Sequence, residues 1–113
     1  MQITTRKANE VLVVDMIGSL DTTTSGDAYD EMVKIAKSGE PKVLVNLKGV
    51  DYISSAGLRA ILTASKLLKT ARGEMRLCEA NDVVREVLET SGFHSLLRLH
   101  DTELDAHIAF RGM

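Results

Sequence analysis

Val43-Leu44-Val45-Asn46-Leu47 is an almost unbroken apolar run, of the kind found in a strand that is covered on both faces. Apolar or small residues then recur at helical spacing and place one apolar stripe on a helix over residues 55–70: Leu58, Ile61, Leu62, Ser65 and Leu68. A buried strand followed by an amphipathic helix is the repeating unit of α/β proteins. The run at residues 43–47 therefore predicts a central strand.

The same alternation continues on both sides of this unit. Before it, we expect a hairpin of strands 3–6 and 11–17 and a helix that begins in the polar cluster 21–25 and ends near Ser38-Gly39. After it, we expect strand 74–78, a helix marked by Val83 to Leu88, strand 96–99 and a helix over 102–110. The pattern predicts an α/β fold with a mixed sheet of about five strands, an opening antiparallel hairpin and about four helices.

Composition narrows the class of protein. The chain has 113 residues with 44% hydrophobic and 27% charged residues, which predicts one domain over residues 1–113 with a packed core. A net charge of −2 and 4% aromatic residues argue against nucleic acid as a partner. We find no run of 18 apolar residues, no leader-like start and no heptad pattern, so we expect a soluble, cytoplasmic protein that is monomeric when free and has no membrane partner.

Motifs for enzymatic chemistry are missing. The sequence has no glycine-rich phosphate loop, no dinucleotide fingerprint and no Gly-x-Ser-x-Gly elbow. His94, His100 and His107 lack the spacing of metal ligands, and Cys78 in an apolar stretch is expected to be a buried thiol. We therefore expect no enzyme activity, no cofactor and no metal site.

Two serines stand at the start of the 55–70 helix. One of Ser54 and Ser55 is expected to be the N-cap, because helix N-termini carry unpaired N–H groups. Ala56 and Gly57 follow, and we interpret these small residues as leaving the surface around the serines bare for another molecule. The partial positive charge of this helix end suits a phosphoryl group, which would alter the surface without unwinding the helix.

At this point the chain resembles a known family, the STAS domains of anti-sigma factor antagonists. The resemblance runs nearly end to end, and its most specific part is the serine segment. Besides the opening hairpin and the strand ending at Leu47, it rests on three stretches: Gly18-Ser19-Leu20-Asp21, Tyr52-Ile53-Ser54-Ser55-Ala56-Gly57-Leu58 and Thr90-Ser91-Gly92-Phe93.

The resemblance implies a partner switch controlled by phosphorylation. The unphosphorylated antagonist would bind an anti-sigma factor that is also an ATP-dependent serine kinase, and so release the target of that kinase. Phosphorylation would end the binding, and a serine/threonine phosphatase of the metal-dependent class would restore it. The acceptor falls on Ser55, which is followed by one small residue and then the glycine. Many members carry aspartate directly before the acceptor; because this chain has Ser54 there, Ser54 is the second choice.

The partner-binding residues predicted from this match surround the serines: Asp21, Thr22, Asp51, Ser54, Ala56, Gly57 and Arg59. Asp51 is expected in the loop before the serines, as a source of negative charge or as a solvated carboxylate. Arg59, Lys66 and Lys69 are either a solvated basic face or contacts for acidic groups of a partner.

Two alternatives remain at this stage. One keeps the fold but makes the chain an unphosphorylated scaffold or small-ligand-binding module, in which the serines are caps alone. The other is a phosphoaspartate receiver domain with Asp15 in its acidic pocket and Asp51 as acceptor, although Asp15 lies inside its strand and lacks an acidic neighbour.

Overall fold

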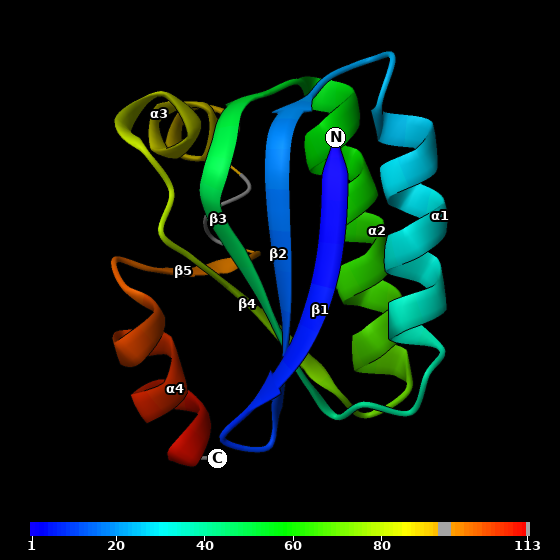
Figure 1. Cartoon of the computed structure of the whole chain (residues 1–113), viewed down its shortest axis with the longest axis vertical. Coiled ribbons are helices and arrows are strands. Elements are labelled where there is room, and N and C mark those ends of the chain that lie inside the picture. Colours follow the sequence, from blue (N-terminus) through cyan, green and yellow to red (C-terminus); the bar gives the residue numbers. More distant parts are fainter. Residues whose placement is uncertain (93–95, 113) are drawn as a thin grey trace.

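A computed structural model describes residues 1–92 and 96–112, which form one five-stranded sheet and four helices (Figure 1). In chain order the elements are β1 (Gln2–Ala8), β2 (Val11–Leu20), α1 (Ser25–Ala36), β3 (Lys42–Ile53), α2 (Ser55–Thr70), β4 (Glu74–Cys78), α3 (Asp82–Thr90), β5 (Arg98–His100) and α4 (Glu103–Arg111). His94 and Phe93, which the sequence analysis singled out, lie outside the described residues.

The strands are ordered β1-β2-β3-β4-β5 in the sheet. β1 and β2 are antiparallel, and every other neighbouring pair is parallel. Strand β3 is therefore central and the sheet is mixed, which confirms the predicted α/β class and the opening hairpin. Parallel neighbours must be joined by crossovers, and α1, α2 and α3 make these connections.

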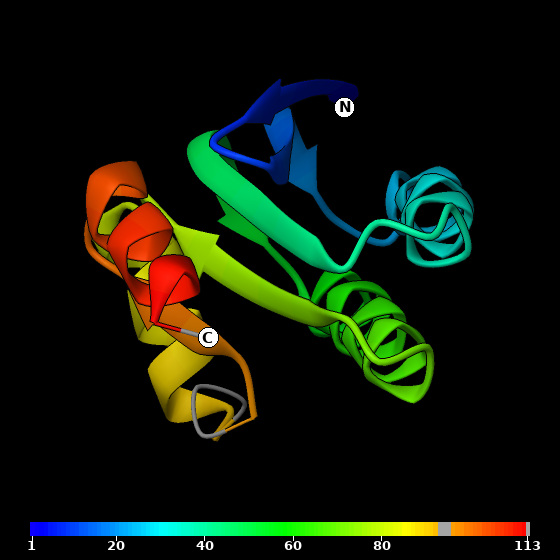
Figure 2. The same cartoon turned by 90° about the horizontal axis from the view of Figure 1, so that it is seen from below.

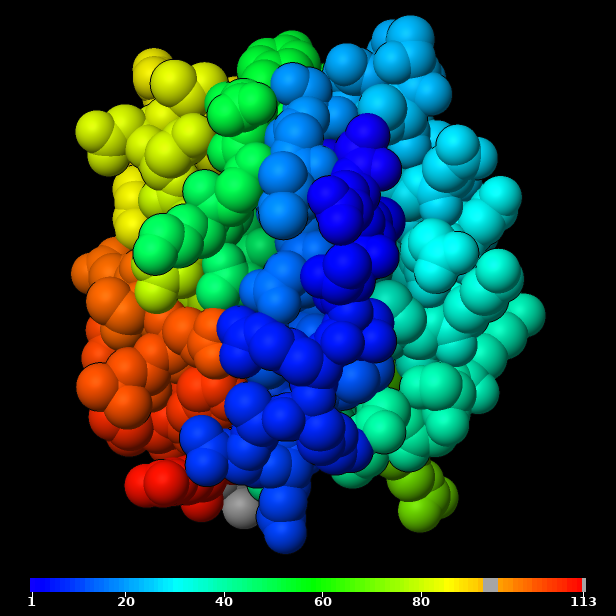
Figure 3. All heavy atoms as spheres, viewed as in Figure 1, coloured from blue at the N-terminus to red at the C-terminus, as the bar shows by residue number. Residues whose placement is uncertain are grey.

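The helices cover the two faces of the sheet unequally. Residues of α1, α2 and α3 share the larger hydrophobic core with one face of the sheet, whereas α4 packs on the other face through Ala106 and Phe110. Figure 2 shows α4 and α3 on opposite sides of β4. In Figure 3 α4 covers only the lower left of its face, and atoms of β1 to β3 are open beside it and towards the top of the view. The three-helix face therefore carries most of the core.

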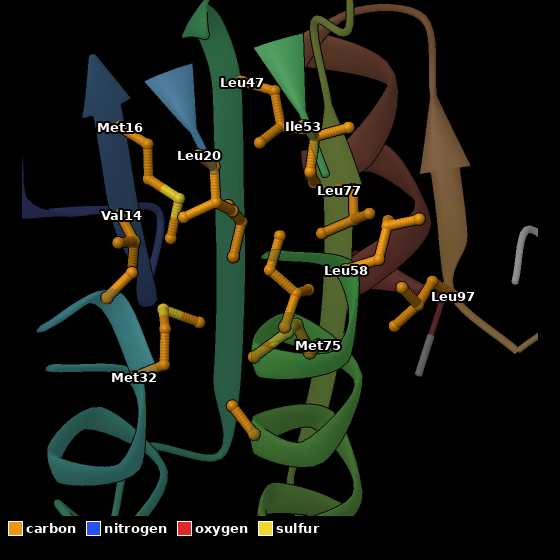
Figure 4. Packing of buried hydrophobic residues seen from close by; sticks show 14 of the residues in the cluster. Val14, Met16, Leu20, Met32, Leu47, Ile53, Leu58, Met75, Leu77 and Leu97 are labelled. Carbon is orange, nitrogen blue, oxygen red and sulfur yellow. The ribbon is translucent and has the colours of Figure 1, made fainter. Parts of the chain in front are cut away.

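The core forms because apolar side chains of the inner strands meet the apolar stripes of α1 and α2. Val45, Leu47 and Ile53 of β3 are fully buried, as are Leu20 of β2 and Leu58 of α2. Figure 4 shows the side chains of Leu20, Ile53 and Leu58 in this layer between the sheet and the helices. Leu20 and Leu58 thus fix the upper end of the sheet against the start of α2.

Four predicted strand boundaries were wrong. Strand β2 runs to Leu20 rather than ending at residue 17, because residues 18–20 pair with β3. Strand β3 runs to Ile53 rather than ending at residue 47, because its outer half pairs with the end of β2, and Asp51 therefore lies in a strand and not in a loop. Strand β1 covers Gln2–Ala8 rather than 3–6, since it pairs with β2 along its whole length. Strand β5 begins at Arg98 rather than at residue 96, because only three of its residues pair with β4.

Helix α4 is fastened to the sheet by a group of polar side chains around Glu103. The Glu103 carboxylate accepts hydrogen bonds from Arg6 at 2.6 Å and from Asn46 at 2.9 Å, and lies 2.9 Å from the Nε2 of His107. Arg6 also pairs with Asp15 at 2.8 Å. These contacts, with that of the Arg6 guanidinium first, lower the pKa of Glu103 to about 2.

None of the helices in the described residues is long and apolar enough to cross a lipid bilayer.

Candidate functional site

The predicted site residues come together because parallel strands end at the same edge of a sheet. Leu20 of β2 is the register partner of Ile53 of β3, so the two strands end side by side. The N–H of Ser54 donates a hydrogen bond to the carbonyl of Leu20 at 2.8 Å, which joins the residue after β3 to the end of β2. Asp21 therefore follows one strand, and Ser55 the other, at one edge of the molecule, where ligands and partners of open α/β sheets commonly bind.

The loop after β2 is held by the carboxylate of Asp21. Its Oδ1 accepts hydrogen bonds from the backbone N–H and hydroxyl of Thr23, at 2.9 and 2.7 Å, and from the N–H of Thr24 at 3.1 Å. These contacts lower the pKa of Asp21, with the hydroxyl of Thr23 as the largest cause. The next residue in the loop, Thr22, is exposed. Asp21 thus shapes the loop, and Thr22 is accessible to a partner.

The two serines have different environments. Ser54 is the N-cap of α2, and its Oγ accepts the N–H of Gly57 at 3.1 Å. Ser55 is the first residue of the helix and is exposed. Its hydroxyl makes no hydrogen bond with any residue that the structure describes. One serine is therefore occupied by capping, while the other offers an unengaged hydroxyl.

The interpretation of Gly57 was wrong. Gly57 is buried and opens no surface beside the serines. A Cβ added to it would lie 2.6 Å from Cγ of Leu20 and 2.8 Å from the carbonyl oxygen of Leu20. The glycine lets the first turn of α2 approach the end of β2, so it supports the site from within. The neighbouring Ala56 is half-buried and reaches the surface.

Asp51 and Tyr52 lie on the last part of β3, and both are exposed. Tyr52 leaves 48% of its surface in solvent one residue before the buried Ile53. Tyr52 was not predicted as a site residue, although an aromatic side chain in a sequence with only four aromatic residues was a usable signal. Asp51 and Tyr52 extend the candidate surface along the strand edge.

A groove of about 340 Å³ between α1 and α2 continues this surface away from Ser55. Its described lining residues come from both helices: Ser25, Gly26, Tyr29, Ala56, Arg59, Ala60 and Thr63. Tyr29 is 38% exposed and was also missed, because the sequence pattern does not tell which two helices lie side by side. Arg59 is exposed, and it is the single charged residue among these described lining residues.

Other parts of the described chain fit the site less well. A hollow of about 560 Å³ lies on the sheet face beside α4 and includes none of the predicted partner-binding residues. One of its charged side chains, Arg6, pairs with two others, Asp15 and Glu103. Within the described residues no group of three or more His, Cys, Asp or Glu side chains is placed to hold a metal ion. The surface around Ser55 is separate from this hollow.

The chain is a small α/β domain that exposes a serine at the start of α2, and comparison with known proteins gives its family. The model of the STAS domain matches residues 2–106. The chain is 35% identical over 98% of its length, and 96% of the relative, to BtrV of Bordetella bronchiseptica, which is assigned to the anti-sigma factor antagonists. It is 30% identical over 94% of its length, and 92% of the relative, to the anti-sigma F factor antagonist of Paenibacillus polymyxa. This chain belongs to the STAS domain family.

Solved structures agree on the fold. An anti-sigma factor antagonist from Mycobacterium paratuberculosis superposes with a TM-score of 0.89 at 20% identity, covering 97% of this chain and 93% of the other. The phosphorylated form of SpoIIAA, a Bacillus cell fate determinant, gives a TM-score of 0.68 at 19% identity, covering 93% and 96%. At such identities the likeness concerns the fold, which confirms the sheet and helices predicted from the sequence.

Proposed function

We propose that this protein is an anti-sigma factor antagonist that works as a phosphorylation-controlled partner switch in the cytoplasm, without enzymatic activity of its own. In its unphosphorylated form it binds an anti-sigma factor that is also a serine kinase of the ATPase type. The kinase phosphorylates Ser55 and the complex separates, and a metal-dependent serine/threonine phosphatase restores the binding form. The names of the two curated relatives support the antagonist role.

The observation that carries the proposal is that the hydroxyl of Ser54 caps the helix whereas the hydroxyl of Ser55 does not. Ser54 already accepts the N–H of Gly57, so its hydroxyl oxygen is engaged in the helix cap. Ser55 is exposed and makes no hydrogen bond to the described residues, so a phosphoryl group can be added there without loss of a cap. This supports Ser55 over Ser54 as acceptor. It also favours the switch over an unphosphorylated module, in which a second, unengaged serine has no assigned use.

The partner surface we propose combines the C-terminal ends of β2 and β3 with the first turn of α2. It contains Thr22, Asp51, Ala56 and Arg59, each at least partly exposed, together with Ser55. Asp21 holds the loop that presents Thr22, and Ser54 holds the first turn. Gly57 is not included because it is buried.

A phosphate on Ser55 adds about −1.5 to −2 charges in the middle of this surface. A 100-fold loss of affinity needs only about 2.8 kcal/mol. Bringing a phosphate against a like charge, or removing the water around it, costs several kcal/mol at an interface. The phosphate alone is therefore enough to separate a complex of ordinary affinity.

The test is to incubate the purified protein with ATP and a lysate of its native cell, and to map the phosphorylated residue by mass spectrometry. Wild type, Ser55→Ala and Ser54→Ala are treated in parallel. We expect one phosphoryl group on wild type and Ser54→Ala, on Ser55, and none on Ser55→Ala. Phosphate on Ser54 in the wild type would move the acceptor by one residue.

A binding assay completes the test of the switch. Immobilised wild type should retain a kinase of the ATPase type from the lysate, and Ser55→Asp should lose it. Thr70→Asp is the matched control, because it also replaces an exposed hydroxyl residue of α2 by aspartate, at the end of the helix that is far from the serines. Equal retention by wild type and Ser55→Asp, with no phosphate on either serine while another kinase in the lysate is active, would leave the unphosphorylated binding module as the better account.

A further inference from the structure

Arg59 stands out among the charged residues near Ser55. It is exposed, and it forms no ion pair with any residue that the structure describes. Four of the other arginines, at 6, 76, 85 and 98, each contact a carboxylate. Arg59 also lines the groove between α1 and α2, whose other described lining residues are uncharged. A guanidinium that has no carboxylate partner and lies among uncharged residues is free to bind an anionic group.

The position of Arg59 relative to Ser55 indicates that this anionic group is a phosphate on Ser55. The two residues lie four apart on α2, so their side chains are on the same helix face, roughly one turn and about 6 Å along the axis from each other. An acidic group placed four residues before a basic group is the favourable orientation of a helical ion pair. The planar guanidinium can donate two parallel hydrogen bonds to a phosphate.

We propose that phosphorylation of Ser55 captures Arg59 in an ion pair with the phosphate and withdraws it from the groove between α1 and α2. The inference rests on Ser55 being the acceptor of the proposed switch, and it adds a second effect of the modification. The surface then gains an anion at Ser55 and loses the cation of the groove, beside Tyr29 and Ala60. A partner segment that presents an acidic group to Arg59 is rejected on both counts.

The experiment is independent of any kinase, because phosphoserine is incorporated at position 55 during translation of the full chain. The second pKa of the phosphate, normally near 6, is measured by ³¹P NMR titration in wild type, Arg59→Gln, Arg59→Lys and Lys66→Gln. We expect the pKa in Arg59→Gln to be higher than in wild type by about half a unit, the size of an exposed ion pair. Arg59→Lys should be intermediate.

Lys66→Gln is the matched control for net charge. It removes one exposed positive charge from α2, but roughly 16 Å along the helix from Ser55, beyond the Debye length at physiological salt. Its phosphate should titrate as in wild type. If Arg59→Gln also titrates as wild type does, the phosphate does not pair with Arg59 and the proposal is overturned.

Withdrawal from the groove has its own readout. Tyr29 and Arg59 line the same groove, so loss of the guanidinium should shift the ring resonances of Tyr29 when wild type is compared with and without phosphoserine. In Arg59→Gln this shift should be smaller, and an equal shift in both would contradict the withdrawal. If no phosphorylated residue is found after incubation with the lysate but the titration shows the expected difference in phosphate pKa, the proposed function is rejected and the ion pair stands.

Discussion

At the scale of single residues, the first turn of α2 is organised by three side chains with separate tasks. Ser54 caps the helix, Ser55 leaves its hydroxyl at the surface, and Gly57 allows the turn to pack on Leu20. The sequence predicted that one serine was a cap but left open which one. The choice depends on the hydrogen bond from Gly57 to Ser54, which the first helical turn places on the residue before the helix.

Gly57→Ala should destabilise the protein although alanine is the better helix former. The added Cβ meets backbone and side-chain atoms of Leu20 at 2.6–3.0 Å. Overpacking of this kind costs about 1–3 kcal/mol, against a gain of about 0.5–1 kcal/mol in helix propensity. We expect a net loss in the free energy of unfolding, measured by urea denaturation.

Gly26→Ala is the matched control for this substitution. Gly26 also lies near the start of a helix, but an added Cβ there meets nothing within 4 Å. Alanine should therefore stabilise the protein or leave it unchanged. A stabilised Gly57→Ala variant would show that the contact with Leu20 relaxes without cost and would remove the packing role of this glycine.

At the scale of elements, α4 depends on polar contacts as well as on its apolar side. Ala106 and Phe110 are buried against the sheet, but the N-terminal end of the helix is held through Glu103. The backbone N–H of Glu103 itself donates to the carboxylate of Glu79 at 2.7 Å. This arrangement joins α4 to β1, β3 and the end of β4, which are distant in the sequence.

Stability should fall in acid because of Glu103. Its pKa is about 2 in the folded protein against 4.5 for an unperturbed glutamate, so the folded state favours the ionised form. The corresponding stability is fully present above pH 4.5 and is lost as the pH falls from 4.5 towards about 2. Urea denaturation from pH 6 down to pH 2 should therefore show a steeper loss for wild type than for Glu103→Gln.

Glu31→Gln is the control for the loss of a carboxylate. Glu31 pairs with Lys34 on the surface of α1, where both side chains are at least half exposed, so it should contribute little. Its stability curve should follow that of wild type. Parallel curves for wild type and Glu103→Gln would mean that the contacts around Glu103 do not favour its charged form.

At the scale of the whole molecule, helices cover one face of the sheet more completely than the other. The helices α1, α2 and α3 cover one face, and α4 covers the lower part of the other (Figure 3). Cys78 at the end of β4 lies under α4 with no exposed surface, together with Leu44 and Phe110. Burial is the first cause that raises the pKa of Cys78 to about 12.

Cys78 should be unreactive in the native protein and should report the opening of the fold. At pH 8 a thiol of such pKa is almost entirely protonated, and the thiolate is the reactive form. We expect reaction with a disulfide reagent to be slow without denaturant and complete at once in unfolding concentrations of urea. The rate of this reaction should rise with urea in proportion to the unfolded fraction. Rapid labelling of Cys78 in the native protein would contradict its burial between β4 and α4.

The sequence alone determined the order of strands and helices, and it placed the two serines at the start of α2. Helical and strand periodicity are local properties, so the run at residues 43–47, the stripe of the following helix and the opening hairpin were all readable from the chain. The resemblance to STAS domains rested on the same local motifs, and the match over residues 2–106 confirmed it.

Only the tertiary structure decided how these parts meet. The pairing of β2 with the outer half of β3 brings Asp21 beside Ser54 and turns the expected loop around Asp51 into strand. The burial of Gly57 and the groove that joins Tyr29 to Arg59 depend on how α2 packs against β2 and α1. Contacts between residues far apart in the chain leave no periodic signal, because register and packing are set by neighbours that the local sequence does not specify.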